Sequence, residues 1–486
     1  MNKAKWMLTA VVAIGLAWPA AAQQTAVFTE ALALWKQGQE YYAHGLYGQA
    51  MEAYQQAVDR LEPVHETDYE LLRMKAQLGY AQSALRLQLP DAERYILDFI
   101  RTYEPDPVAT QALIEAANYF FDSKDYEKAI EFFARIPAWE LSDEQKAEVR
   151  FKMGYAFFAK KKFREAKSNF REIRHLEGPY YYPANYYYGL CEFFDGNYDA
   201  AIKSFRLVEK SRKYSGHVPY YIAQIYFAQG QFRQLIEYAE PRLDERGLRK
   251  TKELHQLVGQ AWFELGDFAK AVPHLEYYAE RTGRMRPEEF YQLAYAQYKV
   301  GKYAAAAKNF EQLVQEDSPM GQYAMFYLAD CYLKTNNRTA ARNAFGAAAR
   351  MNYEPDLREE ALFHYAKLSY ELGFDSDALA AFQQIKPDSP WYSQAQEVMS
   401  DMFIKTRDYE RALAILESIP SMSPQMRRAY QTVAFNRAVQ LMQMADDEQA
   451  EKYFTKSLDA PVDLALKAQA RYWLAEIAHR RKQYQR

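Results

Sequence analysis

The stretch Phe163-Arg164-Glu165-Ala166-Lys167-Ser168-Asn169-Phe170 contains the pattern that decides the fold. An aromatic residue is followed by two variable residues, a small residue, three further residues and a large apolar one. The pattern recurs, exactly or loosely, about every 36 residues, so the chain is built from repeated units of helical-hairpin size. Its central, usually small, residue lies at Ala50, Ala92, Ala129, Ala166, Ala201, Leu235, Ala271, Ala306, Ala341, Ala378, Ala412 and Ala450.

A second small residue precedes most of these positions by twelve residues. It is found at Gly38, Gly154, Gly189, Gly259, Ala294, Ala329 and Ala366. Small residues allow two helix axes to approach closely, so each repeat should form two antiparallel helices. The aromatic residue before the second helix should fill the wedge between neighbouring repeats. Leu235 stands where a small residue is usual, which predicts that the sixth repeat is locally splayed.

This pattern resembles the tetratricopeptide repeat, whose motif has small residues at its eighth and twentieth positions and often a proline near its end. That last place is held by Pro63, Pro105, Pro137, Pro319, Pro355, Pro387 and Pro420. The resemblance covers residues 31–486 and implies an all-α fold, a right-handed α-solenoid of about 12.5 helical hairpins. We therefore expect one continuous solenoid over residues 23–486.

The last repeat is incomplete, because residues 467–480 predict a first helix and the chain stops at Arg486 before a second. We expect either that the protein continues further or that another chain covers this end. Residues 470–476 (ARYWLAE) are also similar to repeats of envelope proteins such as the Tol-associated cell-division coordinator and the outer-membrane assembly lipoprotein. The acylated Cys of that lipoprotein is missing here.

The first 22 residues have the pattern of a secretory signal peptide. Lys3 and Lys5 precede an apolar run from Trp6 to Trp18, and Ala20-Ala21-Ala22 offers small residues for cleavage before Gln23. The apolar run is shorter than the roughly 20 residues that span a bilayer, so we expect no transmembrane span in the mature chain. The sequence thus predicts an exported protein, periplasmic or peripheral to the outer membrane.

No spacing typical of a catalytic, nucleotide-binding or metal-binding motif occurs, so we expect no enzyme activity and no cofactor or metal. The two cysteines, Cys191 and Cys331, fall at one position of repeats far apart in the array, and we expect both to be buried and unpaired. A net charge of −3 argues against a nucleic-acid binder held by phosphate neutralisation.

In the tetratricopeptide family the first helix of each repeat lines a concave groove that faces the ligand. Transferring those positions gives aromatic stripes, which suit an extended peptide or a partner helix. The alternative is that many of these rings only pack on the next repeat. The candidate groove residues are Phe151, Tyr155, Phe158, Tyr186, Phe193, Tyr220, Phe227, Tyr291, Tyr295, Tyr298 and Phe326.

The charge is unevenly distributed along the chain. Residues 23–140 contain 10 Lys and Arg against 19 Asp and Glu, whereas residues 146–286 contain 25 against 17. The basic excess lies in successive loops between repeats, which should form a ridge along one edge; the alternative is a solvated rim. The candidate ridge residues are Lys210, Arg212, Lys213, Arg246, Arg249, Lys250, Lys252, Arg281, Arg284 and Arg286.

Together these features predict a non-catalytic periplasmic scaffold that binds other envelope proteins in outer-membrane assembly, secretion or cell-division complexes. Two alternatives remain open at this point. The repeats could bind peptidoglycan or another anionic surface such as lipid, or they could be the targeting arm of an enzyme encoded beyond residue 486.

Overall fold

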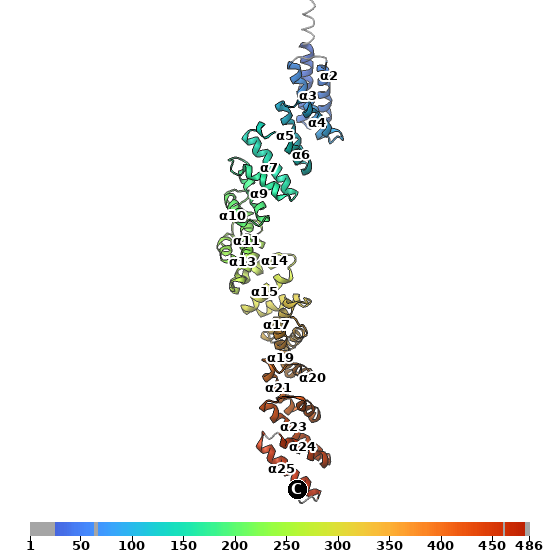
Figure 1. Cartoon of the computed structure of the whole chain (residues 1–486), viewed down its shortest axis with the longest axis vertical. Helices are drawn as coiled ribbons and strands as arrows, with labels where there is room; N and C mark the ends of the chain where they lie inside the picture. The colour runs from blue at the N-terminus through green and yellow to red at the C-terminus, as the bar shows by residue number, and fades with distance from the viewer. Residues whose placement is uncertain (1–24, 63–66, 460–461, 482–486) are drawn as a thin grey trace, which may run out of the picture. The chain divides into compact units, whose positions relative to one another are not determined.

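The computed structural model describes residues 25–62, 67–459 and 462–481, and within these ranges the chain is helical and contains no strand. The predicted signal peptide lies outside the described residues. Figure 1 shows the helices following one another as hairpins in chain order. The described residues divide into two compact units, and the division falls in the repeat that contains Leu235.

The first unit comprises the chain up to Gln229 together with Asp244–Arg249. Its first helix is described over residues 25–43. The further helices are α2 (Tyr47–Leu61), α3 (Thr67–Arg86), α4 (Ala92–Tyr103), α5 (Pro107–Asp122), α6 (Tyr126–Arg135), the 3₁₀ helix η1 (Ala138–Glu140), α7 (Asp143–Ala159), α8 (Phe163–Ile173), α9 (Tyr181–Phe194), α10 (Tyr198–Val208) and α11 (Val218–Ala228).

The second unit comprises Gly230–Leu243 and the chain from Lys250 onwards. Its helices are α12 (Phe232–Ala239), η2 (Glu240–Arg242), α13 (Thr251–Glu264), α14 (Phe268–Arg281), α15 (Pro287–Lys299), α16 (Tyr303–Phe310), η3 (Glu311–Leu313), α17 (Pro319–Lys334), α18 (Arg338–Arg350), α19 (Pro355–Glu371), α20 (Asp375–Phe382), α21 (Tyr392–Lys405), α22 (Tyr409–Ser418), α23 (Pro424–Gln443), α24 (Asp447–Asp459) and α25 (Leu464–Arg480).

The predicted repeat pattern is confirmed in the described residues. All twelve positions of the pattern's central residue lie in the even-numbered helices and are buried, Leu235 included. Twelve hairpins are followed by α25, the first helix of a thirteenth. This helix begins at Leu464 rather than Lys467, because the Asp463 carboxylate caps it by accepting the backbone N–H groups of Ala465 and Leu466. The joining of both units into one right-handed solenoid stays a prediction.

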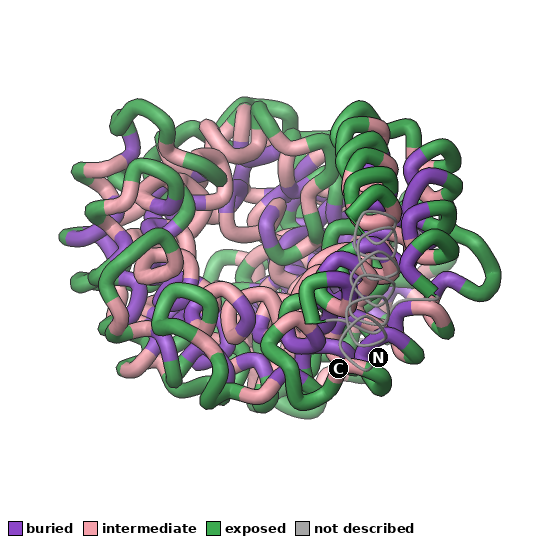
Figure 2. Tube along the Cα trace, turned by 90° about the horizontal axis from the view of Figure 1, so that it is seen from above, coloured by how far each residue is buried: buried purple, intermediate pink, exposed green. Residues whose placement is uncertain are grey.

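Close helix approach explains the glycines at the second small position. A Cβ atom added at Gly154 would lie 2.8 Å from the ring of Phe170, and one added at Gly189 would lie 2.9 Å from the ring of Phe205. Both rings are fully buried and belong to the second helix of the same repeat. In Figure 2 the buried segments recur within the helices, whereas the turns and the outward sides of helices are exposed.

The aromatic residue of the pattern is the first residue of the second helix and fills the space toward the next repeat, as predicted. Phe163 begins α8, and its ring stacks on Phe194 of α9 at a centroid distance of 4.9 Å. Phe268 begins α14, and its ring meets the edge of Tyr295 of α15 at 5.6 Å.

Buried glutamines attach the loops between repeats to the helices of the second unit. The Gln322 carbonyl oxygen accepts the N–H groups of Tyr353 and Glu354 at 3.1 and 2.9 Å, and its amide donates to the Met351 carbonyl at 3.2 Å. Gln431 does the same for the loop at Val462 and Asp463. These side chains satisfy backbone groups that the helices leave without partners.

Candidate protein-binding surfaces

The aromatic stripe on α7 is half-buried and packs against the next repeat. The rings of Phe151, Tyr155 and Phe158 lie 6.0, 5.1 and 5.2 Å from the ring of Tyr187 on α9. Part of each ring is therefore used for packing between repeats, and part of it faces outward.

Tyr186 of α9 was predicted to line the groove, and the structure shows that this prediction is wrong. Tyr186 is only 8% exposed, and its ring stacks on Tyr214 at 4.5 Å. Burial raises the pKa of Tyr186 well above its usual value, and the neighbouring Tyr221 adds to the effect. Tyr186 thus belongs to the core, because the following loop, which holds Tyr214, covers it.

Three further candidates of the first unit are half-buried. The ring of Phe193 meets the edge of Tyr221 at 5.7 Å. Phe227 and Tyr220 lie on α11, where the amide of Gln224 donates to the Tyr220 hydroxyl at 2.9 Å. The Tyr220 hydroxyl and the Gln224 amide thus lie side by side, an arrangement that can bind the main chain of a peptide.

The second unit contains a cluster of tyrosines on α15 and α17. Tyr291 and Tyr295 stack at 6.0 Å, and Tyr295 and Tyr298 both contact the ring of Tyr327, at 5.1 and 5.0 Å. The Tyr298 hydroxyl donates to the Asp330 carboxylate at 2.8 Å. Burial is the main cause that raises the pKa values of Tyr291 and Tyr298, so both hydroxyls stay protonated.

Phe326 of α17 is half-buried, and its ring meets that of Tyr327 edge-on at 5.8 Å. Its ring meets the edge of Phe345 at 5.4 Å and lies 6.5 Å from the imidazole of His364. It is therefore partly committed to packing on the second helix of its own repeat, α18.

A recurrent tyrosine that the sequence analysis missed links the repeats. Tyr187, Tyr221 and Tyr327 each stand fourteen residues before a central residue of the pattern. They stack on Phe170, Phe205 and Phe310 of the preceding repeats at 5.8, 5.6 and 6.0 Å. The constant offset was a signal in the sequence that could have identified them.

The candidate basic residues of the first unit are exposed and come from two loops that lie side by side. The Arg249 N–H donates to the Gly216 carbonyl at 2.8 Å, which joins the loop of Lys210, Arg212 and Lys213 to the loop of Arg246. A Cβ at Gly216 would lie 2.2 Å from the Gly247 carbonyl, so only glycine permits this approach.

The candidate basic residues of the second unit are partly neutralised by nearby carboxylates. Lys250 pairs with Glu253 at 3.6 Å, Arg281 with Glu280 at 3.0 Å, and Arg286 with Glu289 at 3.0 Å. Lys252 is half-buried and Arg284 is exposed. This group is therefore a weaker attractor for anions than the loops of the first unit.

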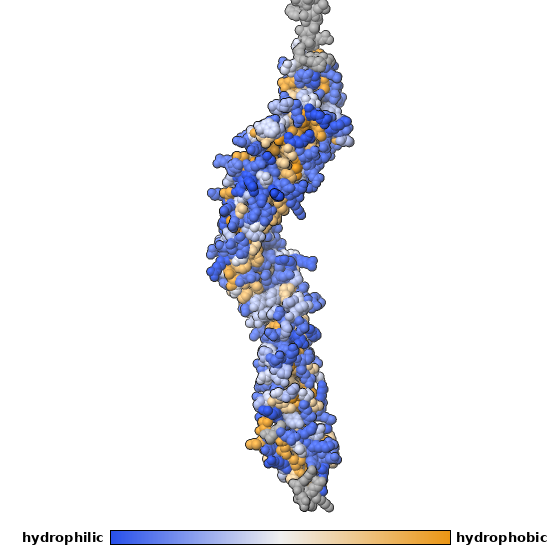
Figure 3. Space-filling view, viewed as in Figure 1, coloured by the Kyte–Doolittle hydropathy of each residue, from blue (hydrophilic) through white to orange (hydrophobic). Residues whose placement is uncertain are grey.

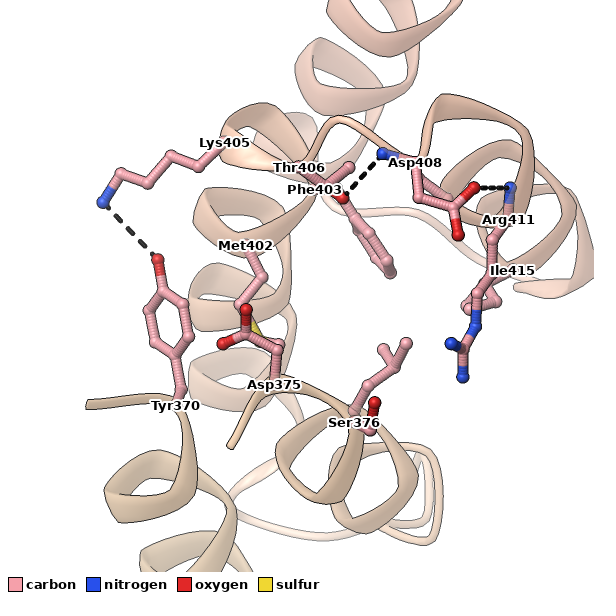
Figure 4. A pocket seen from close by; sticks show the side chains of 12 residues that line it. Tyr370, Asp375, Ser376, Met402, Phe403, Lys405, Thr406, Asp408, Arg411 and Ile415 are labelled. Atoms are coloured by element: carbon pink, nitrogen blue, oxygen red, sulfur yellow. Dashed lines mark hydrogen bonds between the residues drawn. The ribbon is translucent and has the colours of Figure 1, made fainter. Parts of the chain in front are cut away.

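A small pocket of about 170 Å³ lies among α19, α20, α21 and α22 and was not predicted. In Figure 4 the Lys405 ammonium points toward the Tyr370 hydroxyl, while Asp375, Asp408 and Arg411 lie on other sides of the pocket. The Tyr370 hydroxyl donates to Asp401 at 2.9 Å, as Tyr298 does to Asp330, and each pair occupies the same repeat positions. With charges of both signs, the pocket can accept one polar side chain of a ligand.

Both cysteines are buried and free, as predicted, and burial raises the pKa of each thiol to about 12. Across residues 25–62, 67–459 and 462–481, no group of three or more His, Cys, Asp or Glu side chains could hold a metal ion. In the same part of the chain no helix is both long and apolar enough to cross a bilayer. The surface in Figure 3 is largely hydrophilic, with separate apolar patches.

A family model described as tetratricopeptide repeat matches residues 88–142, 151–216 and 291–337. Among solved structures, a tetratricopeptide repeat protein from Parabacteroides merdae aligns at 14% identity over 52% of this chain and 97% of its own, with a TM-score of 0.32. The C-terminal part of a repeat protein of this kind from Cytophaga hutchinsonii aligns at 15% identity over 58% and 98%, with a TM-score of 0.27. MamA of MSR-1 aligns at 17% identity over 35% and 94%, with a TM-score of 0.28. No curated protein matches the sequence.

Proposed function

Because this chain contains tetratricopeptide repeats, a fold that typically binds proteins and is typically non-catalytic, we propose that it is a scaffold of the bacterial cell envelope. It is exported to the periplasm and holds other envelope proteins by an extended peptide or a helix. It has no catalytic role of its own. The observation that carries the proposal is the tyrosine cluster on α15 and α17, with the Tyr298–Asp330 pair at its edge.

The chemistry of this cluster suits a protein partner. Half-buried tyrosine rings offer rigid apolar area that loses little side-chain entropy on binding, and their hydroxyls bind main-chain groups. The Tyr298 hydroxyl donates its hydrogen bond to Asp330, which leaves the hydroxyl oxygen able to accept a hydrogen bond from an N–H group of a bound peptide.

The test separates binding from packing by changing one atom. A displayed peptide library is selected on the whole chain, and the affinities of the selected peptides are then measured on two variants. Tyr298→Phe keeps the ring and should weaken binding by roughly two- to twelvefold, the effect of one neutral hydrogen bond. Tyr332→Phe removes a hydroxyl that is bound to Glu311 at 2.6 Å and should leave affinity unchanged. Equal affinities on all three proteins, or no selected peptide, would refute groove binding.

Export has a separate test. When the gene is expressed in a bacterium with a periplasm, we expect the mature protein in the periplasmic fraction with Gln23 as its first residue. A chain that keeps residues 1–22 and stays in the cytoplasm would exclude the envelope role without affecting the repeat fold.

The exposed basic loops of the first unit favour one alternative function, which is binding to an anionic lipid or glycan surface. Co-sedimentation with sacculi, or with vesicles containing anionic lipid, should then fall with added salt and with Arg246→Glu/Arg249→Glu. If neither salt nor the double substitution reduces co-sedimentation, binding to an anionic surface is excluded.

A further inference from the structure

The most exposed large apolar side chain of the described residues is Trp139, which is 86% exposed. It lies in η1, in the loop between α6 and α7, and this loop is fixed from both sides. Ser142 and Gln145 form a capping box at the start of α7, and the Thr110 hydroxyl donates to the Glu140 carboxylate. Tryptophan is among the side chains that most often contribute the binding energy of protein interfaces, and here the indole is exposed to water on an ordered loop.

The surroundings of Trp139 are acidic. Glu140 follows it in η1, Asp143 and Glu144 lie in the first turn of α7, and Glu104 and Asp106 lie in the preceding loop between repeats. All five are exposed, and no ion pair within the described ranges involves their carboxylates. We call Trp139 with these five residues the acidic tryptophan edge. It requires a basic partner surface, preferably with guanidinium groups that stack on indole.

The same unit presents such a surface two repeats further along. Lys210, Arg212 and Lys213 lie in one loop, and Arg246 and Arg249 lie in the adjoining loop, with the Arg249 N–H bound to the Gly216 carbonyl at 2.8 Å. All five cations are exposed. We call these five residues the basic edge.

The two edges cannot meet within one chain, because the packed helices α7–α10 lie between their loops in the same unit. We propose that the acidic tryptophan edge of one copy docks on the basic edge of a second copy, and that two copies related by a two-fold axis form both contacts. Such an interface is closed and self-complementary, so it stops at a dimer. This association goes beyond the scaffold function and does not depend on it.

Sedimentation velocity of the full chain at several concentrations and salt levels tests this. We expect a particle of twice the chain mass at low salt that dissociates as salt is added, because exposed charge pairs are screened. Trp139→Ala should raise the dimer dissociation constant by at least about 30-fold, as expected for a central tryptophan. Tyr472→Ala removes another largely exposed aromatic side chain, at 63%, and should change nothing.

Charge exchange identifies the partner as a second copy. Glu140→Lys/Glu144→Lys and Arg212→Glu/Lys213→Glu should each be monomeric, and an equimolar mixture of the two should form a heterodimer. Lys161→Glu/Lys162→Glu reverses as much charge in a turn within a repeat and should still dimerise. A wild-type chain that is monomeric at low salt would overturn the proposal. So would a dimer that tolerates Trp139→Ala, or a monomer whose basic edge binds anionic vesicles instead.

Discussion

At the scale of single residues, the small positions of the repeat are set by distance. Gly154 has room for a hydrogen atom only, because a Cβ would lie 2.8 Å from the buried ring of Phe170. A close-packed interior resists even one added methyl group. The twelve-residue spacing between Gly154 and Ala166 predicted that the two helices of this hairpin approach closely, whereas the contact with the Phe170 ring is seen only in the structure.

Replacing Gly154 by Ala should therefore lower the free energy of unfolding by about 1–3 kcal/mol, less the gain in helix propensity of up to about 1 kcal/mol. Gly48→Ala is the matched control, because no atom lies within 4 Å of its added Cβ. Gly48→Ala should be neutral or stabilising. Urea unfolding of both variants checks the prediction, and equal shifts in the two would contradict it.

The buried tyrosines predict a pH dependence. Burial raises the pKa of Tyr54 and of Tyr327 to about 12, and neighbouring tyrosines add to both shifts. In the unfolded chain a tyrosine titrates near pH 10, so the folded state holds these protons more tightly. The stability that these groups contribute is complete below about pH 10 and is lost as the pH rises toward 12.

An alkaline titration tests this loss of stability. Tyrosinate absorbance reports the ionisation of tyrosines, and circular dichroism recorded in the same titration reports the helix content. Exposed tyrosines should ionise first, and a second group should ionise only as helicity is lost. Ionisation of all tyrosines in one step with the helices intact would be the contrary result.

At the scale of elements, the ends of helices depend on side chains that sequence periodicity does not reveal. Gln322 is fully buried at the start of a first helix and bonds to the loop that leads to the next repeat. Its partners lie about 30 residues away in the sequence. For this reason the role of Gln322 could not be predicted from local pattern.

Gln322→Leu keeps the size of the side chain but leaves the N–H groups of Tyr353 and Glu354 without their acceptor. A buried N–H group without an acceptor costs about 1–3 kcal/mol, and because these two groups are only partly buried, the variant should be destabilised by about 1–2 kcal/mol. Gln315→Leu, at an exposed position nearby, serves as the control. Chemical denaturation measures the free energy of unfolding of both variants. If Gln322→Leu loses no more stability than Gln315→Leu, the bonds described do not stabilise the protein.

At the scale of the whole molecule, a repeat array has contacts only between neighbours, so a local change should spread over a limited distance. The two compact units allow this to be tested. Gln322→Leu should increase amide hydrogen exchange in α17–α19 and leave α3–α5 of the other unit at wild-type rates. Mass spectrometry of peptides from both units measures it. A uniform increase in both would mean that the chain unfolds as one cooperative body.

The sequence by itself determined the repeat, its hairpins, the buried small positions and the burial of both cysteines. All of these features depend on contacts within one hairpin or between neighbouring hairpins, and such contacts recur with the period of about 36 residues. It also indicated where aromatic and basic residues concentrate. It could not show which rings remain accessible.

Only the tertiary structure decided that Tyr186 belongs to the core and that Trp139 is exposed to water. It also decided which basic side chains already have a carboxylate partner. The physical reason is that accessibility depends on what covers a side chain. A covering loop such as the one with Tyr214 comes from another part of the chain, and its path is fixed by packing rather than by local period.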